Sequence, residues 1–187
     1  MTYAPALAQR VFPQRTLLRE IAVVGAGALM LTLLAQASVP MQPVPVTGQT
    51  LGVFLVGGWL GFRRGVSSVG LYLAAGFLGA PVFAHGTGGF PVLAGPTGGY
   101  LLGFLAAAGT VGLLGEHGFL KTYARVLLTL LAAQAAIYSF GLAWLAAYVP
   151  KGTVLAYGFW PFLPGALIKT EIPLLPPQKQ SPRPHEV

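Results

Sequence analysis

The sequence contains no cysteine, and charged side chains make up only 8% of its 187 residues. The absence of cysteine excludes disulfide bonds, thiolate metal sites and a cysteine nucleophile. A soluble domain carries roughly 25% charged residues, so this chain has too few charges to cover a surface that faces water. Together with 55% apolar residues and a mean hydropathy of +0.70, this deficit predicts an integral membrane protein that contacts a lipid bilayer.

Motifs for several other chemistries are also missing. No phosphate-binding loop of the form G-x-x-x-x-G-K-[ST] occurs, so any ATP hydrolysis is expected from another chain. The net charge of +7 comes from Lys and Arg scattered between apolar runs, without the basic stripe and interleaved aromatic rings of a nucleic-acid-binding protein. No intramembrane pair of carboxylates and no cluster of metal ligands occurs. We therefore expect no enzyme activity, no metal, no cofactor and no nucleic-acid partner.

The sequence does contain six apolar runs, and about 20 apolar residues are needed to cross a bilayer as a helix. These runs predict an all-α integral membrane protein built as a six-helix transmembrane bundle. The second and third runs are short, and prolines interrupt the sixth. The predicted spans are residues 21–39, 50–62, 66–78, 98–114, 126–149 and 154–175.

The basic residues assign a side to each connection between spans, because cytoplasmic loops collect Lys and Arg. Nine of the eleven basic residues lie in the N-terminal segment, after the second and fourth spans, and in the C-terminal tail. Only Lys151 lies on the opposite side, and Lys169 falls within the sixth span. The alternation predicts a multi-pass protein with both termini in the cytoplasm and residues 176–187 as a cytoplasmic tail.

The two long outer connections, residues 38–50 and 79–99, are rich in Pro and Gly and contain no Lys, Arg, Asp or Glu. Irregular backbone occurs at membrane depth only where protein buries it or where it lines a cavity. Because the second and third spans are short, we expect these loops to re-enter or cap the bundle, with ordinary exposed turns as the alternative.

The stretch GPTGGYLLGF, residues 95–104, ends the second of these loops. Its two adjacent glycines, Gly98 and Gly99, allow a close approach to the backbone, and Thr97 is predicted to cap the following helix. Tyr100 supplies an aromatic ring with a polar tip. The stretch therefore predicts the wall of a small-molecule pocket that faces outward.

Three separated segments resemble the BioY family, the biotin-binding membrane subunits (S components) of energy-coupling-factor (ECF) transporters. The resemblance covers about residues 21–169. It implies a single transmembrane substrate-binding domain over residues 1–175, in the plasma membrane of a prokaryote, that captures biotin on the outer side. It also implies a transmembrane coupling protein and two cytoplasmic ATPases as partners. The segments read VPMQPVPVTGQTLGVFLVGGWLGFRRG, LYLAAGFLGAPVFAHGTGGFPVLAGPTGGYLLGF and PFLPGALIK.

The resemblance also implies ligand contacts. The family usually reads PGDLIK in its last span, where the Asp and the Lys are expected to contact biotin. Here Lys169 matches, whereas Ala166 stands in the place of the acid. His85 follows PVFA, where the family often has a third polar contact. The alternatives are that Lys169 extends to the cytoplasmic face and that His85 is simply solvated.

Further residues complete the predicted sites. Tyr72, Tyr100 and Gln49 are expected to contact the ligand, and a membrane-interface belt is the alternative for the aromatic rings. Ala22 and Ala26 form a small-xxx-small pair in the first span, and small residues let helices approach closely. The resemblance implies that this face docks the coupling protein, with packing inside the chain as the alternative.

Two other functions compete with vitamin uptake through an ATPase-driven complex. A polytopic membrane enzyme would show turnover of a lipid or small substrate, and a stand-alone vitamin carrier would work without partner chains. A passive channel is disfavoured because no predicted span has a polar face.

Overall fold

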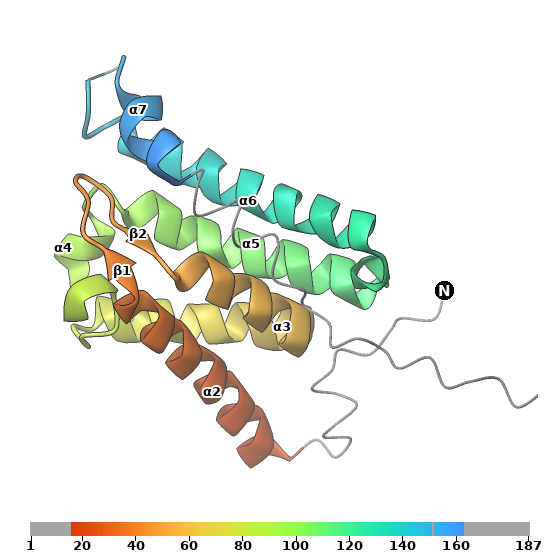
Figure 1. Cartoon of the computed structure of the whole chain (residues 1–187). Helices are drawn as coiled ribbons and strands as arrows, with labels where there is room; N and C mark the ends of the chain where they lie inside the picture. Colours follow the sequence, from red (N-terminus) through yellow and green to blue (C-terminus); the bar gives the residue numbers. More distant parts are fainter. Residues whose placement is uncertain (1–15, 151, 163–187) are drawn as a thin grey trace, which may run out of the picture.

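The computed structural model describes residues 16–150 and 152–162. Over this part the chain is mostly helical, and Figure 1 shows its long helices side by side with their connections gathered at two ends. The elements in chain order are α2 (Leu17–Gln36), β1 (Ser38–Val39), β2 (Val46–Thr47), α3 (Gln49–Phe77), η1 (Ala84–Gly86), α4 (Phe90–Leu93), α5 (Gly98–Glu116), η2 (Phe119–Lys121), α6 (Tyr123–Leu145), α7 (Val154–Gly158) and η3 (Trp160–Phe162).

Helix α3 is a hairpin of two helical arms, residues 49–60 and 62–77. Gly61 breaks it with φ 80° and ψ −176°, a conformation that glycine adopts without the steric cost of a Cβ. The arms lie side by side in Figure 1, and a Cβ on Gly65 would lie 3.1 Å from the Gly57 Cα. The predicted second and third spans correspond to these arms. The predicted loop at Arg63 and Arg64 is wrong, because the chain turns at Gly61 and both arginines lie within the second arm.

Helix α5 is the central helix and packs between α3 and α6. Glycines make these contacts close: a Cβ on Gly103 would lie 2.9 Å from the Ile137 Cα of α6, and a Cβ on Gly112 would lie 2.6 Å from the Phe62 nitrogen of α3. Small residues at helix contacts are the usual means by which membrane helices associate. The packing of the bundle therefore depends on backbone proximity along α5.

The close approach predicted at Gly98 and Gly99 is confirmed. What approaches the two glycines is other residues of the same chain. Gly98 lies against the Leu93 carbonyl of α4, and Gly99 lies against Phe140 and Trp144 of α6. These glycines therefore fix how α5 begins against its neighbours.

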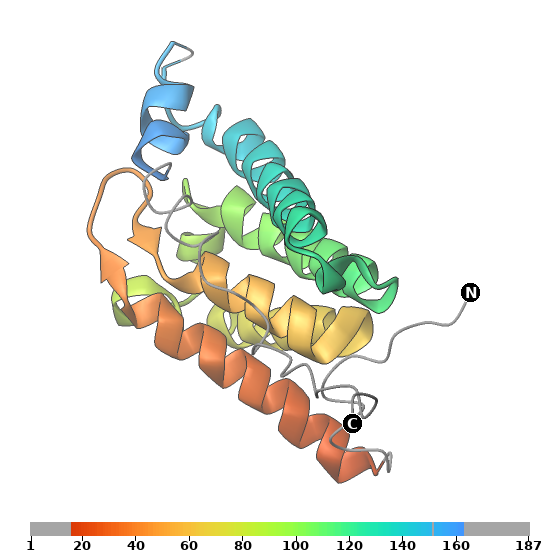
Figure 2. The ribbon, with the colours of Figure 1, turned by 45° about the vertical axis from the view of Figure 1, so that its right-hand side comes forward.

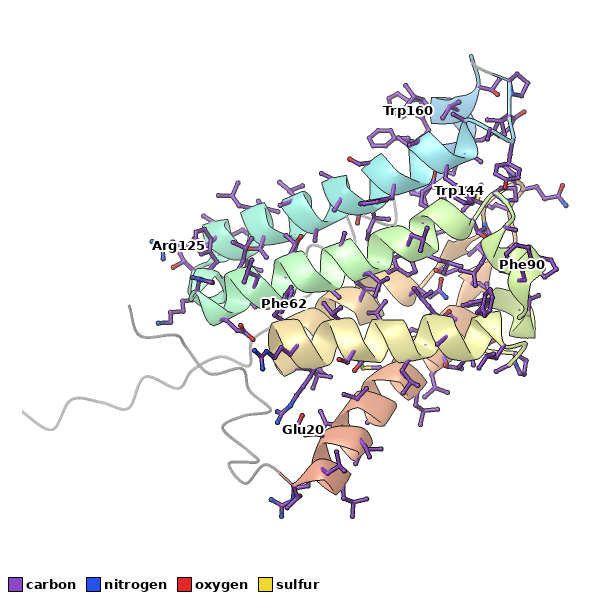
Figure 3. All side chains as sticks on the ribbon, turned by 180° about the vertical axis from the view of Figure 1, so that it is seen from behind. Glu20, Phe62, Phe90, Arg125, Trp144 and Trp160 are labelled. Carbon is purple, nitrogen blue, oxygen red and sulfur yellow. The ribbon has the colours of Figure 1, made fainter. Side chains whose placement is uncertain are left out.

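The charged side chains of the described residues gather at one end of the bundle, here called the charged end. In Figure 3, Glu20, Phe62 and Arg125 mark this end, while Phe90, Trp144 and Trp160 mark the opposite one, here called the loop end. Exposed aromatic rings such as those of Phe90 and Trp160 are typical of a membrane interface. The charged residues concerned are Arg19, Glu20, Arg63, Arg64, Glu116, Lys121 and Arg125.

Two polar contacts join helices at the charged end. The guanidinium of Arg64 forms an ion pair with Glu20, in which Arg64 Nε donates to Glu20 Oε2 over 2.7 Å, and this pair ties α2 to α3. Glu116, the last residue of α5, accepts a hydrogen bond from the Phe62 backbone nitrogen over 2.9 Å. That bond caps the free N-terminus of the second α3 arm, where negative charge is favourable.

Three described helices, α2, α5 and α6, are long and apolar enough to cross a membrane. Large apolar side chains on α2 and α6 are exposed, as expected of a surface in lipid. Leu29 and Leu33 of α2 are 59% and 64% exposed, and Leu128 of α6 is 61% exposed. These observations support a mostly helical membrane protein.

The short antiparallel pair of β1 and β2, in which Ser38 faces Thr47, adds a ribbon that the all-α expectation missed.

The predicted sixth span does not begin as one helix. Helix α7 ends at Gly158, and η3 follows from Trp160. Pro161 explains why the α-helix does not continue, because proline has no backbone N–H to bond the Tyr157 carbonyl four residues earlier and its ring clashes with that carbonyl. The remainder of that predicted span, residues 163–175, and the tail lie outside the described residues.

Candidate functional site

A cavity of about 210 Å³ lies at the loop end, between α3, α5, α6 and the two loops that the sequence marked as Pro- and Gly-rich. Its walls are mostly apolar, with Phe83, Phe104 and Ile137 among them, and its polar groups are hydroxyls, amides and one imidazole. No Asp, Glu, Lys or Arg lines it within the described residues. Such a site suits a largely apolar ligand with a few neutral polar groups.

Gln49 forms a fixed polar group on the α3 wall, in the first turn of that helix. Its amide is 4% exposed; Nε2 donates to the Tyr72 hydroxyl, and Oε1 accepts from Thr47 Oγ1 over 3.0 Å. Tyr72 lies behind Gln49, is 1% exposed and packs edge-on against Phe83 with ring centroids 5.4 Å apart. The structure therefore places Gln49 at the cavity and Tyr72 as the residue that orients it.

The loop from Phe83 to Thr87 forms a second wall, and Gln36 at the end of α2 holds it in place. Gln36 Nε2 donates to the Phe83 carbonyl over 3.1 Å, and its Oε1 accepts from the Gly86 nitrogen over 3.0 Å. Between these two anchors His85 adopts φ 58° and ψ 26°, which is uncommon for a residue with a side chain.

The His85 ring is exposed and lines the mouth of the cavity, with Nδ1 3.4 Å from Ser38 Oγ. Sequence reasoning found His85 and missed Gln36. Gln36 could have been identified from the sequence, because it is a polar residue near the end of the apolar first span.

Tyr100, in the first turn of α5, lines the cavity with its ring while its hydroxyl is already paired. The hydroxyl donates to the Gly158 carbonyl of α7 over 2.8 Å, and the ring stacks on Phe162 at a centroid distance of 5.7 Å. The predicted side-chain cap by Thr97 is wrong, because its hydroxyl donates to the Val92 carbonyl instead, over 3.1 Å.

The α6 wall carries two polar residues that sequence reasoning missed. Gln134 and Tyr138 both line the cavity and lie one helical turn apart on the same face. The Tyr138 ring packs edge-on against Phe159 at 5.0 Å. Four-residue spacing of polar side chains inside an apolar span was the signal that could have identified them.

The other predicted residues lie away from this cavity or beyond the described chain. Ala22 and Ala26 are exposed on α2, and nothing lies within 4 Å of a Cβ built on Gly25 between them. Lys169 and Ala166 lie outside the described residues. No group of three or more potential metal ligands occurs in the part of the chain that was described.

Comparisons with known proteins point to one family. The model of the BioY family matches residues 7–175. A biotin transporter BioY from Thermotoga maritima is 37% identical over 159 residues, which cover 84% of this chain and 93% of that protein. Another, from Rhizobium etli, is 34% identical over 162 residues, covering 82% and 87%. The crystal structure of the S-component for biotin from an ECF-type ABC transporter matches with a TM-score of 0.74 and 26% identity, over 91% of each chain.

Proposed function

The chain belongs to the BioY family, and on this premise we propose that it is the biotin-binding S component of an ECF transporter. It takes up biotin and is not an enzyme: its relatives are transporters, and its structural neighbour is a transport subunit. Its partners are a transmembrane coupling protein and cytoplasmic ATPases, which supply the energy that a chain without a phosphate-binding loop does not.

The observation that carries this proposal is the uncharged cavity at the loop end. Biotin combines a bicycle, in which an apolar thioether ring is fused to a neutral ureido ring, with an alkyl tail that ends in a carboxylate. Apolar walls formed by Phe83, Phe104 and Ile137 suit the thioether ring and the alkyl chain, and hydroxyl and amide groups offer hydrogen bonds to the ureido ring. The proposed ligand-contacting residues are Gln49, His85 and Tyr100, with Tyr72 holding Gln49, and the motif residues Lys169 and Ala166.

We further propose a six-helix bundle whose charged end is cytoplasmic and whose cavity opens to the outside. Five of the seven charged residues at the charged end are basic, as the positive-inside rule requires of a cytoplasmic face. In this arrangement residues 38–50 and 79–99 cap the cavity from the outer side. Residues 1–175 then form one transmembrane domain, both termini are cytoplasmic, and residues 176–187 form a tail.

Helix α2 is the proposed docking face for the coupling protein. Ala22 and Ala26 are exposed, and Gly25 between them is partly exposed with open space beside it. Small residues on an exposed membrane helix allow a partner helix to approach closely.

The direct test is whether tritiated biotin copurifies with the detergent-solubilised full chain and is displaced by unlabelled biotin. We expect saturable binding by the wild type and weakened binding by Lys169→Ala, because the ammonium donates to a ligand oxygen. Lys179→Ala, in the proposed tail, is the matched control and should bind as the wild type does. Absence of saturable binding to the wild type would contradict the proposed function, and unchanged binding by Lys169→Ala would remove that residue from the site.

A further inference from the structure

The turn between α5 and α6, residues 117–125, carries two cations that no described acid neutralises. Lys121 and Arg125 are both exposed at the charged end of the bundle. The two described acids are engaged elsewhere at that end, Glu20 in the ion pair with α3 and Glu116 as the cap of an α3 arm. Within the described residues, no carboxylate lies within ion-pair distance of either cation.

Leu120 fixes this turn to the bundle. A Cβ on Gly115 of α5 would lie 2.9 Å from Leu120 Cδ1, and a Cβ on Gly58 of α3 would lie 3.4 Å from the same atom. The side chain of Lys121 folds back over Gly118, where a Cβ would lie 3.6 Å from the ammonium nitrogen. The two cations are therefore presented by a turn that packing against two helices holds in place.

Arg125 lies where its own helix disfavours a positive charge. It is in the first turn of α6, which contains no acid, and the helix dipole places partial positive charge at that end. The guanidinium carbon lies 5.7 Å from the centroid of the Phe119 ring, and this cation–π contact offsets part of the cost. An anion from outside the described chain would offset the rest.

The surface around the two cations is apolar and exposed. The rings of Phe119 and Tyr123 are both exposed, as is typical of residues at a membrane interface. Leu128 lies one turn after Arg125 on the same face of α6, a helix long and apolar enough to cross a bilayer, and it is also exposed. A phospholipid has the same order of groups, a headgroup phosphate next to acyl chains. A soluble acidic protein would match the cations and leave the apolar side chains uncovered.

We propose that the turn between α5 and α6 binds the headgroup of an anionic phospholipid, in the leaflet that meets the charged end. Lys121 and Arg125 bond the phosphate oxygens, and charge-assisted bonds of this kind are strong. The rings of Phe119 and Tyr123 lie at the level of the headgroup, and Leu128 contacts the acyl chains. The turn lies at the opposite end of the bundle from the loop-end cavity, so the inference stands or falls independently of biotin binding.

The test measures lipid binding to the detergent-solubilised full chain by native mass spectrometry, with dioleoylphosphatidylglycerol and dioleoylphosphatidylcholine as probes. We expect the wild type to bind its first phosphatidylglycerol roughly 30-fold tighter than its first phosphatidylcholine, because each cation contributes about 5-fold. Lys121→Gln combined with Arg125→Gln should abolish this preference. The matched control is Arg19→Gln combined with Lys179→Gln, which removes the same charge and should keep the preference. Arg19 is on α2, and Figure 3 shows α3 and α5 between α2 and α6.

An undiminished preference in the Lys121 and Arg125 variant would overturn the inference. Equal losses in both double variants would also overturn it, because they would mean diffuse attraction to net charge instead of a site at this turn. If the double variant does not fold, Arg125→Gln alone decides the matter, with an expected loss of about 5-fold. Excess hexaglutamate should not displace the bound lipid from the wild type, because it offers carboxylates without acyl chains. Displacement would assign the turn to an acidic protein and contradict the proposal.

Discussion

At the scale of single residues, the loop-end cavity depends on polar side chains that hold other parts of the site. Tyr72 holds Gln49, and Gln36 holds the backbone on both sides of His85. The sequence predicted Tyr72, Gln49 and His85 as members of one site, yet it did not indicate that Tyr72 lies behind Gln49. Gln49 and Tyr72 lie on the two arms of α3, which come together only because the chain turns at Gly61, and His85 lies on η1. Spacing along the sequence carries no information about that arrangement.

Gln36→Leu should loosen the loop that carries His85. The substitution removes the bonds to the Phe83 carbonyl and the Gly86 nitrogen, each worth about 1 kcal/mol. Hydrogen exchange at the Gly86 amide should therefore accelerate about ten-fold or more. Thr32→Val is the matched control, because its hydroxyl bonds only to the Ala28 carbonyl of its own helix. Equal exchange rates in both variants would show that Gln36 does not hold this loop.

At the scale of elements, the apolar runs predicted where helices lie better than where they end. The predicted spans 98–114 and 126–149 appear as α5 and α6 with shifted ends, and 21–39 appears as α2. Figure 2 shows α2 beside the hairpin of α3. The position of that turn was missed because Gly61 lies among other glycines, and only the three-dimensional structure shows which one takes a positive φ. The early end of α7 follows from Pro161, which the sequence already displayed.

Gly103→Ala should destabilise the contact between α5 and α6. The added Cβ would lie 2.9 Å from the Ile137 Cα, a backbone atom that can yield only if the helices separate. We expect a loss of about 1–3 kcal/mol, as in overpacked cores, seen as a lower Tm in detergent. Gly70→Ala is the control, since nothing lies within 4 Å of its new Cβ. Alanine favours a helix over glycine, so this control should be neutral or stabilised. Equal Tm values for the two variants would contradict close packing at Gly103.

At the scale of the whole molecule, the two ends have different chemistry. The charged end is tied together by the Glu20–Arg64 pair and by the Glu116 cap on Phe62, whereas the loop end contains the cavity and exposed aromatic rings. Helix α2 is attached at both ends, through Glu20 and through Gln36, while the face with Ala22 and Ala26 stays exposed. The alternation of basic residues along the sequence predicted this segregation, because each turn between helices returns the chain to the opposite end.

That segregation predicts which end faces the cytoplasm. The chain has no cysteine, so single cysteines introduced at Met41 and Thr122, both exposed, report one end each without background. Met41 lies in the loop-end connection between β1 and β2, and Thr122 lies between η2 and α6 at the charged end. We expect a membrane-impermeant maleimide to label Met41→Cys on intact cells, and Thr122→Cys only after the membrane is opened. The physical reason is the five basic residues at the charged end, which favour the cytoplasmic side during insertion. Labelling of Thr122→Cys on intact cells, with Met41→Cys protected, would mean the opposite orientation and a cavity that opens inward.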